Sequence, residues 1–289
     1  MQKFTLAAAF GALMTSAALA STAQAGEVEI RNVVARVVVI PEDRSDIQVS
    51  VTQGSSGLPA IEVSRRGDDV IIDGGLRWRI QNCRGGDYVP DPTQMPSGVS
   101  VNVRNHGSVE MADAPLIVIR TPMDVDVDAG GAVWGAIGRA RSVELGSGGC
   151  GDWSIGNVSG ALSVAVGGSG DVRTGTAQAL EVAVGGSGDV RTGAVTRADL
   201  SIGGSGDITV ASVSGPVDVA IGGSGEVNIG GGRASSMDIA IGGSGTVIFN
   251  GEAGDVDAAI AGSGDIRITR VTGRVERAVV GSGDILIGG

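Results

Sequence analysis

Hydrophobic and polar residues alternate along most of this chain, in short runs that are separated by glycine-rich segments. In the C-terminal half, β-branched residues stand three positions before and three positions after the serine of each G-S-G tripeptide, with small or charged residues between them. A period of two is typical of strands that bury one face and expose the other. The pattern therefore predicts two short strands, one on either side of a glycine-rich corner.

The G-S-G corner returns at a nearly constant interval of 18 to 20 residues, and the segment 164–175 recurs unchanged at 182–193. The corner serines are Ser169, Ser187, Ser205, Ser224, Ser244, Ser263 and Ser282. A fixed period of this length is typical of a solenoid, whose units bury a face only by stacking on their neighbours. We therefore predict an all-β fold: a right-handed single-stranded parallel β-helix with coils roughly 4.8 Å apart. The corner glycines allow φ > 0 and a close approach between successive coils.

The first 25 residues are expected to be a secretory signal peptide that is removed from the mature protein. They carry Lys3 near the start, an apolar run over 4–20, and the small-residue cleavage pattern Ala23-Gln24-Ala25. The rest of the chain is therefore expected to be exported, to the periplasm or to the cell surface and beyond. No later segment has the length and apolar character of a membrane-spanning helix, so no transmembrane segment is expected.

The regularity of the pattern divides the exported chain into two parts. Residues 140–289 hold the regular G-S-G-D repeats, and residues 26–139 are expected to continue the same solenoid in degenerate form. Within that N-terminal part, the alternating runs at 46–51 and 61–74 are predicted to be strands of coils that lack the regular corner. Residues 74–98 interrupt the pattern with glycine and proline and are predicted to form a long loop. Long loops in compact domains are often functional.

Charge narrows the classes of partner. The formal net charge is −11, and aromatic residues make up only 2% of the chain. An acidic surface repels the phosphate backbone, so nucleic acid is not an expected partner. Sparse aromatic rings also make a sugar-binding groove along the repeats unexpected. The repeats therefore offer a surface with few anchoring side chains.

The chain contains two cysteines, Cys83 in the predicted loop and Cys150 in the irregular corner G-S-G-G-C-G-D-W. In an oxidising compartment an isolated pair is most simply a disulfide. Such a bridge would fix the loop against the solenoid. The alternative of two free thiols or a metal site lacks supporting histidines.

Any ligand-binding side chains are expected in the predicted loop, because it concentrates the residue types that dominate binding hot spots. These are Arg77, Trp78, Arg79, Arg84 and Tyr88. An equally simple interpretation makes Trp78 a packing residue beneath the loop. The residues alone do not choose between the two roles.

A column of acidic residues two positions after the corner serine offers a possible metal site. Its aspartates are Asp171, Asp189, Asp207, Asp265 and Asp284. Stacked carboxylates repel one another, so something must offset the repulsion. One hypothesis is that they accept hydrogen bonds from corner N–H groups. The other is bound Ca²⁺, since the corner is similar to calcium-binding β-roll repeats, although here the motif occurs once per coil. No other cofactor is expected.

Enzyme chemistry has little support in the sequence. A Ser-His-Asp or Cys-His mechanism would need His106, the single histidine, which stands in a polar turn. Parallel β-helices also host polysaccharide-cleaving enzymes, which cluster carboxylates with a basic side chain. Asp68, Asp69, Asp73 and Arg77 could form such a cluster, but a charged turn explains them better. We therefore expect no enzymatic activity.

The recurring G-S-G-D-[VI] after an alternating apolar strand resembles the head GIN domain family of auto-transporter adhesins. The resemblance covers residues 140–289, and residues 26–139 are similar to a degenerate continuation of it. It implies a right-handed β-helix at or beyond the cell envelope and an adhesive role.

These observations together predict an exported, non-enzymatic, adhesin-like binding or surface-interaction module. Its partner would be an envelope or extracellular component, protein or glycan. One alternative is a structural envelope scaffold without a specific ligand. A further alternative is a carbohydrate-active β-helix enzyme.

Overall fold

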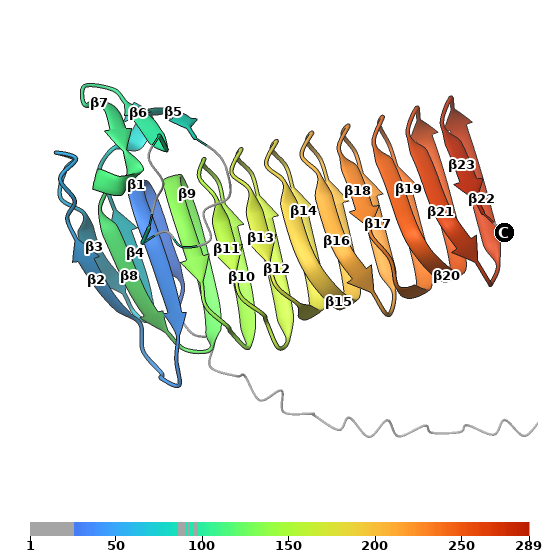
Figure 1. Ribbon diagram of the computed structural model, residues 1–289, viewed down its shortest axis with the longest axis horizontal. Coiled ribbons are helices and arrows are strands. Elements are labelled where there is room, and N and C mark those ends of the chain that lie inside the picture. Colours follow the sequence, from blue (N-terminus) through green and yellow to red (C-terminus); the bar gives the residue numbers. More distant parts are fainter. Residues whose placement is uncertain (1–25, 86–90, 92, 95–97, 289) are drawn as a thin grey trace, which may run out of the picture.

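The computed structural model describes residues 26–85, 91, 93–94 and 98–288. Strands stack one behind another along a single axis, so that the molecule is an elongated solenoid with a small sheet attached near its N-terminal end (Figure 1). The predicted signal peptide, residues 1–25, lies outside the described residues. Its assignment stays a prediction.

The elements follow one another in three groups. The N-terminal strands are β1 (Val28–Pro41), β2 (Gln48–Thr52), β3 (Glu62–Arg66), β4 (Asp69–Asp73), β8 (Leu116–Thr121) and β9 (Asp124–Ile137). Between β4 and β8 lie the 3₁₀ helix η1 (Arg77–Arg79), strands β5 (Ile80–Arg84), β6 (Ser100–Val103) and β7 (Gly107–Glu110), and the 3₁₀ helix η2 (Met111–Asp113). The repeats supply β10 (Ser142–Ser147), β11 (Trp153–Ile155), β12 (Ala161–Val166), β13 (Val172–Thr174), β14 (Ala177–Val184), β15 (Val190–Ile202), β16 (Ile208–Val213), β17 (Val217–Ile221), β18 (Glu226–Ile229), β19 (Arg233–Ile241), β20 (Thr246–Gly262), β21 (Asp265–Val271), β22 (Val275–Gly281) and β23 (Asp284–Ile287).

Strands of successive coils pair in parallel and form two ladders along the axis. The ladder before the corner runs through β9, β10, β12, β14, β15, β17, β19, β20 and β22. The ladder after the corner runs through β1, β9, β11, β13, β15, β16, β18, β20, β21 and β23. The predicted all-β parallel solenoid is therefore confirmed, whereas the hand of its winding stays a prediction.

The alternation in the sequence sets which side chains form the core. In every coil before the last, residues three before the corner serine have at most 2% exposure, and residues three after it have 0%. The columns are Val166, Val184, Ile202, Ile221, Ile241 and Ile260, then Val172, Val190, Ile208, Val227, Val247 and Ile266. Burying each such side chain contributes roughly 1.5–3 kcal/mol. The core is thus one continuous apolar column inside the coils.

The corner glycines permit close stacking without an unusual backbone. A Cβ built on Gly168 or Gly186 would collide with a carbonyl oxygen of the preceding coil. The positive φ that glycine allows is not used at the regular corners. Positive φ occurs at Gly151 and Gly281, in the first and last such corners, but not at the corner glycines of the coils between them. Close approach alone therefore explains why the regular corners need glycine.

The N-terminal end departs from the predicted coils. Strand β2 pairs antiparallel with β8, and β3 pairs antiparallel with β4, so β2 and β3 do not belong to parallel coils, whereas β4 pairs in parallel with β1. The strand character of the segments 46–51 and 61–74 was predicted correctly, but the pairing of β2 and β3 was not. Half-buried Val49, Val51 and Ile61 pack against the core. These strands therefore cover the first coil.

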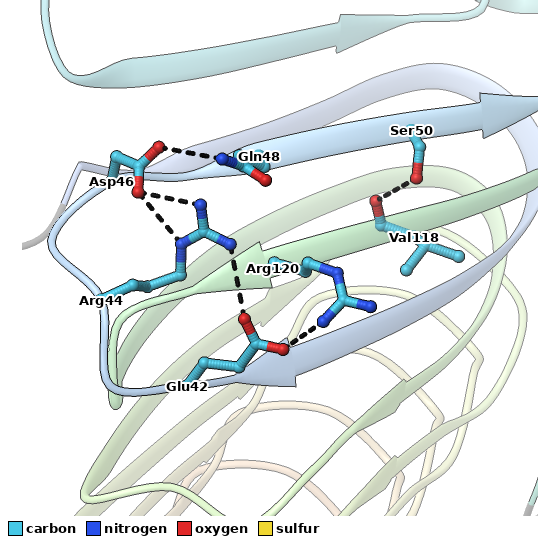
Figure 2. A network of polar contacts seen from close by, with 7 residues as sticks. All are labelled: Glu42, Arg44, Asp46, Gln48, Ser50, Val118 and Arg120. Atoms are coloured by element: carbon cyan, nitrogen blue, oxygen red, sulfur yellow. Dashed lines mark hydrogen bonds and ion pairs between the residues drawn. The ribbon is translucent and has the colours of Figure 1, made fainter.

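A polar network holds the turn between β1 and β2 in place (Figure 2). Glu42 pairs with Arg120 of β8 and, at 3.4 Å, with Arg44. Arg44 in turn contacts Asp46 at 2.8 Å. Because Glu42 joins the turn to β8, the network helps to set β2 alongside β8. Solvent screening keeps the contribution of each exposed pair to stability small.

Strands β5, β6 and β7 form a separate antiparallel sheet, here called the side sheet (Figure 1). It packs on the outside of the first corners through a second apolar core. The core contains Val34, Leu58, Leu76, Val99, Val101, Val103, Val109, Met111, Ala114, Ala132 and Trp134. Part of the predicted loop 74–98 therefore forms η1 and β5 rather than a loop.

The side sheet covers the first coils, in which the position of the corner serine is held by apolar residues. The backbone of Cys150 forms a parallel β-bridge with Ala132, and Ala132 pairs with Val34 in the neighbouring coil. These three residues therefore occupy the position that serine holds in later coils. Cys150 N–H donates to Gly131 O, as Ser169 N–H donates to Gly149 O. The column is thus apolar beneath the side sheet and becomes serine where the corner meets solvent.

The last described coil, with β22 and β23, has no further strand stacked on it among the described residues. Val279, Val280 and Leu286 are 45%, 76% and 56% exposed. Arg277 pairs with fully buried Ala258 and so occupies an inward column. The earlier members of that column are Val164, Val182, Leu200, Val219 and Ile239, all buried. The last coil therefore carries a charge where the others carry an apolar side chain.

Candidate functional site

The side sheet presents its polar face outward. Strand β6 places Val101 and Val103 in the second core, so alternation turns Asn102 and the following Arg104 towards solvent. The antiparallel register pairs Ile80 with Val103. Arg104 N–H donates to Arg79 O at 2.8 Å, which extends this pairing by one residue. Arg79 and Arg104 thus stand opposite each other at one end of the sheet.

Trp78 lies at the same end and is exposed rather than buried. Its side chain is 66% exposed, the largest exposure among the described tryptophans, while Trp134 and Trp153 are 2% and 1% exposed. The guanidinium of Arg104 stands 4.7 Å from the centroid of the Trp78 ring, within the range of a cation–π contact. This exposure favours a binding role for Trp78 over packing beneath the loop, and both roles stay predictions.

The backbone around this end is conformationally unusual. Arg77 has φ of 46°, and the other described non-glycine residues with positive φ are Asn32 and Asn105. Asparagine enters this region readily, whereas arginine does so at a cost. Asn105 follows Arg104 in the β6–β7 turn, and Arg77 opens η1. Strain of this kind is often found where a side chain must be presented in a fixed direction.

The structure brings together some of the predicted binding residues and separates others. Arg77, Trp78 and Arg79 are consecutive in η1, and Arg104 joins them from β6. Arg84 stands at the far end of β5, paired with Ser100. Tyr88 lies outside the described residues. Arg104 was missed because its segment was interpreted only as a polar turn; its position one residue after the alternating V-S-V-N-V run was the available signal.

The predicted disulfide is confirmed. Cys83 and Cys150 are bonded, with their Cα atoms 6.2 Å apart. The bond links β5 to the corner column of the solenoid and so anchors the side sheet. Beside it lies a groove of about 410 Å³ lined by Arg31, Asn32, Arg77, Ile80, Gln81, Gly130, Gly131, Gly149 and Cys150.

The aspartate column beside the corners has a structural role. Between five pairs of successive coils, an aspartate Oδ1 accepts a hydrogen bond from the backbone N–H of the equivalent residue in the next coil, with N···O distances of 2.8–3.2 Å. The donors are Asp171, Asp189, Asp207, Glu226 and Asp284, and the acceptors are Asp152, Asp171, Asp189, Asp207 and Asp265. Arg191 adds an ion pair to Asp189 at 2.9 Å. The hydrogen-bonding hypothesis for this column is therefore confirmed.

Calcium binding by the column stays a prediction. Among the residues that the structure describes, no three or more His, Cys, Asp or Glu side chains gather in a way that could hold a metal ion. Hard cations such as Ca²⁺ take six to eight oxygen ligands. One oxygen of each accepting aspartate is already engaged in the ladder of N–H donors, so the column offers fewer ligands than its composition suggests.

A second acidic group, which the sequence interpretation missed, lies near the N-terminal end of the solenoid. Asp126 pairs with Glu144 in the ladder before the corner. Partial burial, then the negative charges of Glu144, Asp128 and Asp69, raise the pKa of Asp126 to about 6. Burial likewise raises the pKa of Asp152 under the side sheet. The coil register that stacks these carboxylates was the signal that could have revealed Asp126.

The carboxylates considered for enzyme chemistry do not converge. Asp69 and Asp73 stand at opposite ends of β4, roughly 13 Å apart along the strand. Glycosidases that act through paired carboxylates need them within roughly 5–10 Å. Asp73 forms an ion pair with Arg31 at 2.9 Å. Asp69 accepts a hydrogen bond from the backbone N–H of Glu27 at 3.1 Å. Their arrangement is that of structural contacts.

Comparison with known families supports the sequence resemblance in the repeats. Residues 192–289 match the family model described as "Putative auto-transporter adhesin, head GIN domain". No curated protein matches the chain.

The helices among the described residues are two 3₁₀ turns of three residues, so none is long or apolar enough to cross a membrane.

Solved structures share the fold along nearly the whole chain. A protein named "putative adhesin" from Parabacteroides distasonis has 16% identity and a TM-score of 0.54. A "putative lipid binding protein" from the same organism has 18% identity and a TM-score of 0.52, and a "putative adhesin" from Bacteroides fragilis has 16% and 0.50. Each alignment covers 91% of this chain and 93% of the other. At such identities the likeness establishes the β-helix fold alone.

Proposed function

We propose that the chain is an exported, non-enzymatic, adhesin-like module that binds an envelope or extracellular partner through the side sheet. The observation that carries the proposal is the exposed Trp78 with Arg104 beside its ring, on a sheet anchored by a disulfide. Tryptophan and arginine are the residues most enriched in binding hot spots. A rigid support also lowers the entropy cost of binding. The family matched by residues 192–289 is described by an adhesive role, which agrees with this proposal.

The test is a binding screen of the mature chain against glycans, envelope extracts and lipid vesicles, the last because one structural neighbour is named as lipid binding. Trp78→Ala should abolish binding while the β-sheet circular dichroism stays unchanged. The matched control is Leu286→Ala, which removes an exposed apolar side chain at the other end of the solenoid. Binding that survives Trp78→Ala, or that is lost equally with Leu286→Ala, would refute this surface.

A structural scaffold without a specific ligand is the second candidate. The observation in its favour is the ladder of aspartates, which stabilises coil stacking without any ligand. A scaffold would show no saturable partner in the same screen. Retention of the protein in the envelope would then be unaffected by Trp78→Ala.

A further inference from the structure

We propose that the ligand of the side sheet is an acidic polysaccharide, one that carries carboxylate groups on its sugar rings. This inference rests on the proposed function and adds the chemical class of the ligand. The surface concerned is formed by Arg77, Trp78, Arg79 and Arg104, and is called here the arginine–tryptophan surface.

Among the described residues the arginines of this surface have no acidic partner, whereas nine others in the protein do. The nine that pair with a carboxylate are Arg31, Arg44, Arg120, Arg141, Arg191, Arg233, Arg267, Arg270 and Arg274. Within the described residues, no carboxylate lies within ion-pair distance of Arg77, Arg79 or Arg104. In a chain of net charge −11, such a group of unpaired guanidinium groups is unexpected for a merely solvated surface.

Backbone pairing places two of these arginines, Arg79 and Arg104, opposite each other. Arg79 and Arg104 follow the Ile80–Val103 pair across neighbouring chain segments, and the backbone bond between them is 2.8 Å. Like charges directly opposite each other on a sheet destabilise it. An anion between them would remove the repulsion and accept charge-assisted hydrogen bonds from both guanidinium groups.

Trp78 indicates that the anion belongs to a saccharide. The ring remains 66% exposed with Arg104 beside it, so it presents apolar area next to a positive charge. A uronic acid residue matches both features, because its pyranose ring has an apolar face and its carboxylate lies at the edge. A simple acidic peptide would satisfy the arginines but would leave most of the indole in water.

The negative charge of the repeats favours binding of a polyanion at the N-terminal end of the solenoid. The outward column of the repeats carries Glu181, Asp199, Asp218, Asp238, Asp257 and Glu276. These carboxylates repel a polyanion along the length of the solenoid. An acidic chain is therefore directed to the N-terminal end, where the arginine–tryptophan surface lies.

The experiment measures binding of the oxidised mature chain to polygalacturonate by isothermal titration calorimetry, with neutral dextran in parallel. Polygalacturonate should bind, dextran should not, and raising NaCl from about 50 mM to about 500 mM should weaken binding by at least about tenfold. Arg79→Gln and Arg104→Gln should each weaken binding by about tenfold or more. Arg197→Gln is the matched control, because Arg197 is also exposed and has no ion pair among the described residues; its affinity should equal that of the wild type.

Three outcomes would overturn the inference. The first is absence of binding to polygalacturonate, and the second is equal binding by wild type, Arg79→Gln and Arg104→Gln. The third is equal affinity for polyglutamate of the same charge, which would make the partner an acidic peptide. A neutral glycan or protein that binds through Trp78 without salt dependence would leave the proposed function standing and remove only the acidic ligand.

Discussion

Val190 and Arg191 are neighbours in β15 whose side chains face opposite sides of the coil. Val190 is fully buried, whereas Arg191 is exposed and pairs with Asp189. Val190→Asp should lower the free energy of unfolding by about 3–5 kcal/mol or more, because the core offers no partner for a buried carboxylate. Arg191→Asp should cost about 1 kcal/mol, since it removes only a surface ion pair and adds local repulsion. Urea denaturation of the two variants gives the comparison, and equal losses would contradict the inward–outward assignment.

Asp126 is expected to make stability depend on pH. Its folded-state pKa of about 6 lies above the ordinary value of 3.8 for an aspartate, so the folded protein binds this proton more tightly than the unfolded chain does. Stability should therefore increase as pH falls through the window between about 6 and 4, in which this carboxyl group becomes protonated in the folded state.

Asp126→Asn should remove that dependence. Because the side chain is partly exposed, the gain near neutral pH should be modest, about 1 kcal/mol or 2–4 °C in Tm. Melting curves at pH 7.5 and pH 4.5 measure it, with the exposed column member Asp218→Asn as control. A variant that is less stable than the wild type at pH 7.5, or a gain that persists undiminished at pH 4.5, would argue against charge repulsion at Asp126.

At the level of the elements, the disulfide is expected to anchor the side sheet rather than the solenoid. Cys83→Ser with Cys150→Ser removes a link between residues 67 apart, which in the chain-entropy model stabilises by about 4 kcal/mol. Hydrogen exchange should then accelerate in β5, β6 and β7, because their contacts with the solenoid are otherwise limited to the second core. Exchange in β14 to β20 should stay unchanged. Acceleration throughout the repeats would show that the bond stabilises the whole solenoid.

The repeats were predictable because each inward column repeats the same residue types, so one coil determines the next. The side sheet was not predictable in the same way. Its strands pair across a long insertion, and only the register shows that the column of Cys150 continues through Ala132 and Val34. The antiparallel pairing of β2 and β3 was missed for a similar reason, since alternation reveals a strand but not the direction of its neighbour.

The candidate site, too, was predictable only where its residues are adjacent in the sequence. Local composition identified Arg77, Trp78 and Arg79, because they are adjacent in the sequence. Arg104 came from a distant strand and was recognisable only through the pairing of β5 with β6. Which aspartate would carry a raised pKa also depended on burial and on stacked neighbours, and these are properties of the fold.

At the scale of the whole molecule, the last described coil should be kept from self-association by Arg277. Inward charges on edge strands oppose pairing with another chain. Arg277→Val would complete an apolar end with Val279 and Ile285, and this variant should form dimers or larger species as its concentration rises. Light scattering coupled to size exclusion, over a hundredfold range of concentration, measures the association.

The control for this prediction is Arg197→Val, which adds the same side chain in the middle of the solenoid, away from any open strand edge. It should behave as the wild type does. An Arg277→Val protein that has the mass of the wild type at every concentration would show that Arg277 does not protect the end.

Because the coils are uniform, the length of the solenoid can change without changing the surface that binds a ligand. The arginine–tryptophan surface lies near one end, and the coils between Cys150 and Ser282 extend roughly 34 Å towards the other. Because 164–175 and 182–193 are the same sequence in the same register, one coil can be duplicated or lost between them without changing either end. The reach of the protein is therefore a quantity that evolution can adjust in steps of a single coil, independently of what the protein binds.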